Sequence, residues 1–195
     1  VQISYEDKVQ SEYNPDLIIY TPAIRSTSHL MQHFANSGIK MMKRSEVLGL
    51  ISSSEKTIAI AGTHGKTTTT AMVSHILYYS GIEVTGFVGG IMSNYDSNYI
   101  DSGSEYIVAE ADEFDRSFLT LTPAISAVLS MDADHLDIYG GSEEVTIGFK
   151  DFINKTKKGG TVYLHRSVIK NFTSNEWEVV QEKYKCLTFG DKDSD

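Results

Sequence analysis

Hydrophobic and polar positions along the chain follow two periods, one typical of buried strands and one typical of helices. An apolar run at residues 57–61 is followed by a glycine-rich turn at 62–65 and by apolar residues at helical spacing over 66–80. Gly81 then stands in the usual place after a helix. A second helix is expected over 142–157. Further segments have the length and composition of strands: 83–88, 106–111, 124–130, 161–165 and 184–189. Strands separated by crossover segments predict an α/β fold, with a mostly parallel sheet flanked by helices on both faces.

The first part of the chain shows the same alternation in shorter form. Its expected elements are a strand at 17–20 and helices at 28–36 and 45–51. The polar segment 52–56 then has the composition of a linker. We therefore predict two regions. Residues 1–52 would be the tail of a Rossmann-like domain, and residues 53–195 a second α/β domain.

Composition argues against several classes of function. The chain has 195 residues, a formal net charge of -9 and a pI near 5.1, whereas general binders of nucleic acid or anionic membranes are normally basic. It has no apolar run of about 18 residues and no signal peptide pattern at its start. The single cysteine, Cys186, cannot form an internal disulfide. We expect a cytoplasmic protein with no nucleic acid partner and no membrane insertion. Because it opens without methionine, we expect a piece of a longer chain.

The turn between the first strand and helix of the second region carries the clearest chemistry. Glycines let a backbone approach an anion closely, and the N–H groups at a helix start point toward it. Lys66 would bridge phosphate oxygens and the Thr67 hydroxyl would bind Mg²⁺, although Ile60 stands where the general P-loop pattern has its first glycine. The residues expected to bind a nucleotide are Gly62, Thr63, His64, Gly65, Lys66, Thr67 and Thr68. The alternative is an ordinary glycine turn with an exposed lysine.

An acidic segment lies at the end of the third strand of this region. Glu110 falls inside a run that otherwise has the composition of a buried parallel strand, where an unpaired carboxylate is costly. A metal ion or a basic partner would remove that cost, so Glu110 is a candidate metal ligand. The alternative is an acidic strand end that pairs with Arg116 or is solvated. The individual roles of Asp112, Glu113 and Asp115 remain open.

A second acidic cluster follows the next strand. Asp132, Asp134, His135 and Asp137 could supply oxygen and nitrogen ligands to a divalent cation, with His135 as the main candidate. Taken alone, the segment would also fit an acidic turn. Ligands of parallel sheets bind at the carboxyl ends of the strands, so we expect this cluster to lie near Glu110 and the glycine-rich turn.

Together these motifs resemble the Mur ligase family of peptidoglycan synthesis. The string AGTHGKTTTTAMVSHIL is similar to the family's phosphate loop, and VAEADEFDRSFLTLTPAISAVLSMDADHLDIYGG is similar to its second and third motifs. The resemblance runs from about Thr21 to the end of the chain. It implies a P-loop NTPase-like central domain in residues 53–195, and a remnant of a UDP-substrate-binding domain in residues 1–52.

By this resemblance, the bacterial parent enzyme uses ATP to join L-alanine to the lactyl carboxylate of UDP-N-acetylmuramate. The carboxylate would attack the γ-phosphate, and the amine would then attack the resulting acyl phosphate. The family uses two divalent ions, Mg²⁺ with Mn²⁺ as a substitute. The resemblance assigns Thr67 and Glu110 to the first ion, and Glu110 and His135 to the second. Lys66, Glu110 and His135 are the catalytic residues that it implies.

Other interpretations remain open at this point. A recycling member of the same family joins a preformed tripeptide to the same nucleotide sugar, but the direct run from Asp115 to Pro123 favours the alanine-adding type. A P-loop protein that is not a ligase would hydrolyse nucleotide without any UDP-sugar. The family's glycine-rich start and its amino-acid-binding last domain are missing from this sequence. We therefore expect these residues alone to bind nucleotide without forming an amide.

Overall fold

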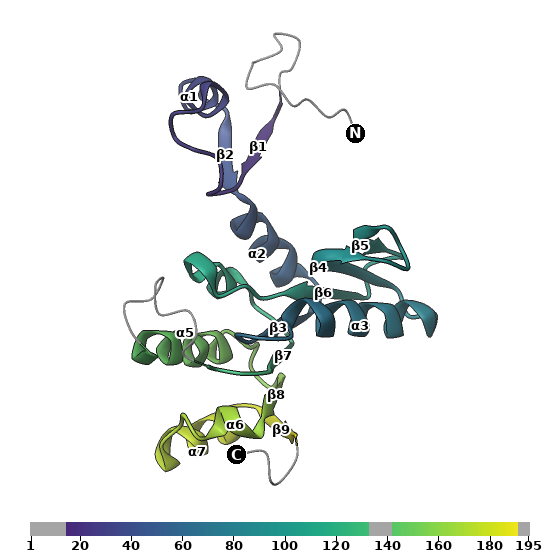
Figure 1. Ribbon diagram of the computed structural model, residues 1–195, viewed down its shortest axis with the longest axis vertical. Helices are drawn as coiled ribbons and strands as arrows, with labels where there is room; N and C mark the ends of the chain where they lie inside the picture. The colour runs from purple at the N-terminus through teal and green to yellow at the C-terminus, as the bar shows by residue number, and fades with distance from the viewer. Residues whose placement is uncertain (1–14, 133–141, 191–195) are drawn as a thin grey trace. The chain divides into compact units, whose positions relative to one another are not determined.

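The computed structural model describes residues 15–132 and 142–190 of the chain. They belong to two compact units, which divide between Leu48 and Gly49. The first unit contains a two-stranded sheet, and the second contains a seven-stranded sheet with the helices that connect its strands (Figure 1). None of the helices within these described ranges is long and apolar enough to cross a membrane.

The first unit is a short β–α–β arrangement. Strand β1 (Leu17–Tyr20) pairs in parallel with β2 (Lys40–Lys43), and α1 (His29–Ala35) connects them. The hydroxyl of Ser28 caps α1 by accepting the N–H of Met31. The sequence does not predict β2, because Lys40–Lys43 contains none of the β-branched or aromatic residues that mark a strand such as β1. A parallel β–α–β unit is the repeating element of doubly wound domains.

Helix α2 (Arg44–Ser54) spans the division between the units. The interpretation of 52–56 as a linker is wrong, because the helix continues to Ser54 and a strand begins at Lys56. Three consecutive serines explain the difference. Each hydroxyl donates to the carbonyl three residues earlier, so these polar side chains find their partners within the helix itself.

The second unit is built on a mostly parallel sheet, as predicted. Its strand order is β5-β4-β6-β3-β7-β8-β9, and only the pairing of β4 with β5 is antiparallel. The strands are β3 (Lys56–Ala61), β4 (Val84–Met92), β5 (Ser97–Asp101), β6 (Tyr106–Glu110), β7 (Ile125–Val128), β8 (Thr161–His165) and β9 (Lys185–Phe189). The middle strands β3 and β6 are almost fully buried, which matches their continuous apolar sequence.

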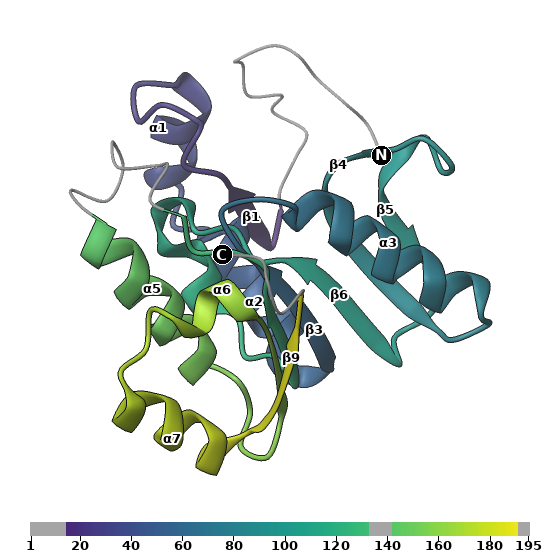
Figure 2. The same cartoon turned by 60° about the horizontal axis from the view of Figure 1, so that its bottom comes forward.

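Helices connect the parallel strands and cover the sheet. They are α3 (Lys66–Tyr79), the 3-10 helix η1 (Phe114–Thr120), α5 (Ser142–Asn154), α6 (Arg166–Ile169) and α7 (Ser174–Lys183). The connection from β3 through α3 runs toward the β4 edge, whereas the connections from β6 onward run toward the β9 edge. Right-handed crossovers in opposite directions place α3 on one face and α5 and α7 on the other. Figures 1 and 2 show α3 running along β4 and β6, with α7 beside β9.

Helix α3 approaches the sheet through small polar residues. Ser74 is fully buried, and a Cβ added to Gly86 of β4 would lie 2.7 Å from its hydroxyl oxygen. The apolar side chains of Met72, Ile76 and Tyr79 are instead 57%, 57% and 83% exposed. The apolar spacing therefore predicts the helix correctly and its buried side in part, because Val73 and Leu77 pack against the core of the sheet. Between them, the small side chain of Ser74 allows the helix to approach Gly86 closely.

Candidate functional site

The loop between β3 and α3 has the backbone of an anion-binding turn. Gly62 and Gly65 have φ angles of 144° and 79°, a region that favours glycine. A Cβ at Gly62 would also come within 3.0 Å of the backbone of Ser130. Gly65 is the N-cap residue of α3, and having no side chain it offers no capping acceptor to the first turn. The N–H groups at that helix end are therefore oriented to receive an anion.

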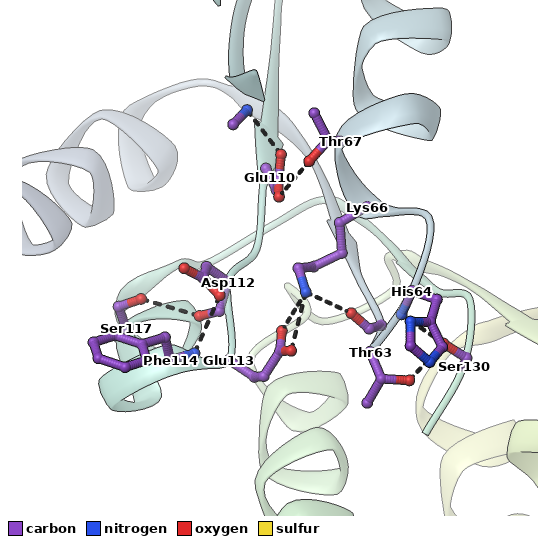
Figure 3. A network of polar contacts seen from close by, with 12 residues as sticks. Thr63, His64, Lys66, Thr67, Glu110, Asp112, Glu113, Phe114, Ser117 and Ser130 are labelled. Carbon is purple, nitrogen blue, oxygen red and sulfur yellow. Dashed lines mark hydrogen bonds and ion pairs between the residues drawn. The ribbon is translucent and has the colours of Figure 1, made fainter. Parts of the chain in front are cut away.

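The side chain of Thr63 points to the end of β7 (Figure 3). Its hydroxyl lies 2.8 Å from the hydroxyl of Ser130, and it accepts the N–H of Asp132 at 3.1 Å. The backbone N–H of His64 donates to the Ser130 hydroxyl at 3.0 Å, and the His64 ring lies at the surface with Nε2 4.0 Å from Asp132. These contacts fix the loop to the neighbouring strand. The sequence does not identify Ser130, because its partners lie more than 60 residues away.

Thr67 and Glu110 meet at the carboxyl end of the sheet. The Thr67 hydroxyl, in the first turn of α3, donates to Glu110 Oε1 at 3.0 Å. Glu110 is the last residue of β6, and its Oε2 accepts the backbone N–H of Gly89 at 2.8 Å. Figure 3 shows the Glu110 carboxylate held between these two donors. The two residues predicted to share a metal ion therefore lie side by side, although they are 43 positions apart in sequence.

Lys66 is not the exposed loop residue of the alternative interpretation. Its side chain is 14% exposed, and it forms an ion pair with Glu113, which is 9% exposed. The Lys66 ammonium lies 2.8 and 3.0 Å from the two carboxylate oxygens, and it also donates to the Gly62 carbonyl at 2.8 Å. The acidic segment after β6 thus contributes Glu113 to the site. Its partner is Lys66, and the sequence left this role open.

Asp112 has a structural part in the same segment. Its carboxylate accepts the N–H of Phe114 at 3.2 Å, and its carbonyl accepts the Ser117 hydroxyl at 3.0 Å and the N–H of Phe118 at 3.1 Å. These bonds shape the start of η1, which carries Glu113 at its N-cap position. Asp112 therefore positions the backbone on which Glu113 sits.

A cavity of about 330 Å³ lies beside Thr67 and Thr68. It extends along α3 to His75 and is lined on its other side by the end of β4 and by Tyr95. His75 Nδ1 lies 2.6 Å from the Tyr95 hydroxyl. Burial raises the pKa of Tyr95, with a smaller contribution from Tyr78. The candidate phosphate loop therefore borders a cavity that could hold a further ligand.

The predicted residue His135, with Asp134 and Asp137, lies outside the described residues. The side chain of Asp115 is likewise not described. Among the side chains that the structure does describe, no three His, Cys, Asp or Glu residues gather as a metal site would require. Of the residues predicted to bind metal, the structure therefore describes Thr67 and Glu110.

Comparison with known proteins identifies a family. The family model described as "Mur ligase middle domain" matches residues 60–195. The chain is 44% identical over 173 residues to the UDP-N-acetylmuramate–L-alanine ligase of Flavobacterium johnsoniae, covering 86% of this chain and 38% of that protein. It is 46% identical over 150 residues to the corresponding ligase of Cytophaga hutchinsonii, covering 75% and 32%. The chain thus spans less than half the length of these curated relatives.

Solved structures lead to the same family. The UDP-N-acetylmuramate–alanine ligase of Thermotoga maritima superimposes with a TM-score of 0.74 at 27% identity, covering 96% of this chain and 41% of that one. The UDP-N-acetylmuramate:L-alanyl-gamma-D-glutamyl-meso-diaminopimelate ligase of Neisseria meningitides gives a TM-score of 0.72 at 20% identity, covering 90% and 59%. At that identity the second likeness shows the fold alone.

Proposed function

The chain belongs to the Mur ligase family, and on that basis we propose that it provides the ATP-binding part of an enzyme that joins L-alanine to the lactyl carboxylate of UDP-N-acetylmuramate. The named relatives at 44% and 46% identity support the alanine-adding reaction. We propose this activity for a whole protein containing the chain, because the chain covers 38% of the first of those relatives. The first unit would then be the remnant of the domain that binds the UDP part of the substrate.

One observation carries the proposal of nucleotide binding. Lys66 and Thr67 begin a helix directly after a glycine-rich turn, and Glu110 from the adjacent strand lies 3.0 Å from the Thr67 hydroxyl. Hydroxyl and carboxylate oxygens are the ligands that Mg²⁺ prefers, so these two residues fit the first metal ion. Mn²⁺ could replace it. When bound, the ion would offset the charge of the ATP phosphates.

The chain's own groups suit a reaction between two anions. A carboxylate that attacks a triphosphate is repelled by it, and the charge that accumulates needs fixed positive groups. The N–H groups at the start of α3 and the Lys66 ammonium would hold the phosphate oxygens in place. Glu110, held by the Gly89 N–H, would keep its carboxylate directed at Thr67. We further propose, from the family resemblance, that His135 serves a second ion shared with Glu110.

Calorimetric titration of the chain with ATP and with ADP tests the nucleotide site. We expect binding in the presence of Mg²⁺ that weakens at least tenfold in EDTA, an equilibrium change of about 1.4 kcal/mol. Release of phosphate by the whole protein should require both UDP-N-acetylmuramate and L-alanine. Turnover with a tripeptide but not with alanine would instead assign the recycling reaction, and hydrolysis without any UDP-sugar would exclude a ligase.

Replacement of His135 by alanine in the whole protein tests the second ion. A histidine that holds only that ion should leave Mg–ATP binding nearly intact while acyl-phosphate formation falls sharply. Neutral imidazole is the form that binds metal, so turnover should also decline as pH falls through roughly 6.5. A His135→Ala enzyme with normal turnover would remove the two-ion arrangement.

A further inference from the structure

The Lys66 ammonium, which the proposed nucleotide site would use to hold phosphate oxygens, is paired with the carboxylate of Glu113. Both carboxylate oxygens lie within 3.0 Å of the ammonium, and both side chains are largely buried. The Gly62 carbonyl takes another ammonium proton at 2.8 Å. Lys66 is therefore paired with a carboxylate and largely removed from open solvent.

The segment that carries Glu113 is firmly anchored. Phe118 in η1 is 1% exposed, stacks on Phe152 with ring centroids 5.3 Å apart, and meets Phe149 edge-on at 5.6 Å. Asp112 holds the start of η1 through the hydrogen bonds described above. A shift of the whole segment would disrupt these contacts. Exchange of partners at Lys66 is therefore a matter of side-chain movement.

We propose that Glu113 is a positioning residue that competes with the nucleotide phosphates for Lys66, and so makes nucleotide binding depend on the divalent cation. This inference rests on the proposed nucleotide site. When phosphate takes the Lys66 ammonium, the Glu113 carboxylate no longer faces that ammonium and lies beside the phosphate oxygens instead. Like charges in a poorly solvated place oppose binding. A bound divalent cation offsets that repulsion, and metal-free nucleotide has nothing to offset it.

Glu113→Gln removes the charge and keeps the shape of the side chain. We expect the variant to bind metal-free ADP at least about tenfold more tightly than the unchanged chain, or about 1.4 kcal/mol. Binding of Mg–ADP should change by less than about threefold, or about 0.65 kcal/mol. The proposal is tested by one ratio, the dissociation constant for ADP in EDTA divided by that in Mg²⁺. This ratio should fall in Glu113→Gln. Glu178→Gln, which removes an equal charge from the exposed surface of α7, is the matched control and should leave the ratio unchanged.

If Glu113 only holds Lys66 in place and does not compete with phosphate, a different result is expected. Glu113→Gln would then weaken both forms of ADP together and leave the ratio as it was, which would overturn the proposal. Failure of the unchanged chain to bind Mg–ADP would overturn the nucleotide site itself, and this inference with it. A preserved Mg–ADP affinity with an unchanged ratio would overturn this inference alone.

A measurement on the unchanged chain does not depend on whether the variant folds. The ammonium resonance of Lys66, assigned by its loss in Lys66→Met, should show slow proton exchange in the free protein because the ion pair shields it. Addition of Mg–ADP should shift this resonance as phosphate replaces the Glu113 carboxylate. An ammonium resonance that is the same in the free and bound protein would mean that the pair persists, and would refute the exchange of partners.

Discussion

At the scale of single residues, the site depends on charges that are buried in pairs. Lys66 and Glu113 are largely removed from solvent, and the charge of each is compensated by the other. Two charges taken out of water gain little net free energy from their pairing, but removal of one leaves the other without compensation. The pair is consequently sensitive to change on either side, even though it contributes little as a whole.

Lys66→Met should therefore lower the free energy of unfolding by about 3 kcal/mol, because the largely buried Glu113 carboxylate loses the Lys66 ammonium. The double variant Lys66→Met with Glu113→Gln should recover much of that loss, since the carboxylate charge that Lys66 compensates is removed as well. Urea denaturation of the single and double variants measures the coupling. Lys150→Met is the control, because its ion pair with Glu176 lies nearer the surface and should matter far less. Equal losses in the single and double variants would show that Lys66 contributes through packing rather than charge.

The sequence predicts these residues unequally. Lys66, Thr67 and Glu110 could be identified because each has a recognisable place at a helix start or a strand end. The partners Glu113 and Ser130 could not, because their contacts join segments 47 and 67 positions apart and depend on strand register. Acidic residues also follow strands in many proteins without any functional role. The position of Glu113 in the sequence therefore does not indicate that it pairs with Lys66.

At the scale of elements, β4 contributes to the site through a glycine, Gly89, that leaves room for the Glu110 carboxylate. A Cβ added to Gly89 would collide with the Glu110 carboxylate, whose oxygen accepts the Gly89 N–H. The strand can therefore approach Glu110 closely only with glycine at this position. This contact links the end of β4 to the Thr67–Glu110 pair.

Gly89→Ala should displace the Glu110 carboxylate and weaken binding of Mg–ADP at least tenfold, about 1.4 kcal/mol. Binding of metal-free ADP should change much less, because the proposed role of Glu110 is to hold the metal ion. Titration of both forms by calorimetry distinguishes the two effects, with circular dichroism to verify that the sheet is retained. A parallel loss of both affinities would indicate general damage to the fold instead.

Helix α7 is not among the elements predicted from the sequence, although its start carries a recognisable signal. Thr173 and Glu176 form a capping box, in which each side chain accepts the backbone N–H of the other residue. The spacing of a threonine and a glutamate three residues later would have identified the helix start. Strand β5 lacks such a signal, because an edge strand with mostly polar residues shows little hydrophobic period.

The same capping box predicts a pH dependence. A hydrogen bond from Lys150, together with the Thr173 N–H, lowers the pKa of Glu176 to about 2 from an ordinary 4.5. A carboxyl whose pKa is depressed by folding stabilises the protein above about 4.5, and this contribution disappears as pH falls toward 2. Lys150→Met should move the pKa of Glu176 upward in an NMR titration. An unchanged pKa would assign the shift to the backbone contact alone.

At the scale of the whole molecule, topology brings the motifs together. The connections after β3 and β6 leave the sheet in opposite directions, so the carboxyl ends of these neighbouring strands are left accessible at one edge. The turn at 62–65 and the acidic segment after Glu110 both lie there. Strand alternation in the sequence predicts a parallel sheet but not the order of its strands. That order is set by crossovers whose direction no local pattern records.

The division of the chain inside α2 can be tested by truncation. Ser52 is fully buried and belongs to the second unit: its hydroxyl accepts the Thr122 N–H at 3.0 Å, and its carbonyl accepts the Thr57 hydroxyl at 3.1 Å. Residues 44–195 keep these contacts and should unfold at nearly the same urea concentration as the longer chain, with unchanged affinity for Mg–ADP. Residues 55–195 lose both bonds and leave the buried Thr57 hydroxyl and the half-buried Thr122 N–H without these acceptors, which should cost roughly 2–4 kcal/mol. Comparison of the two truncated proteins by urea denaturation and calorimetry shows whether the end of α2 stabilises the second unit. If residues 55–195 are as stable as residues 44–195, α2 is dispensable to the second unit, and the nucleotide-binding fold begins at β3.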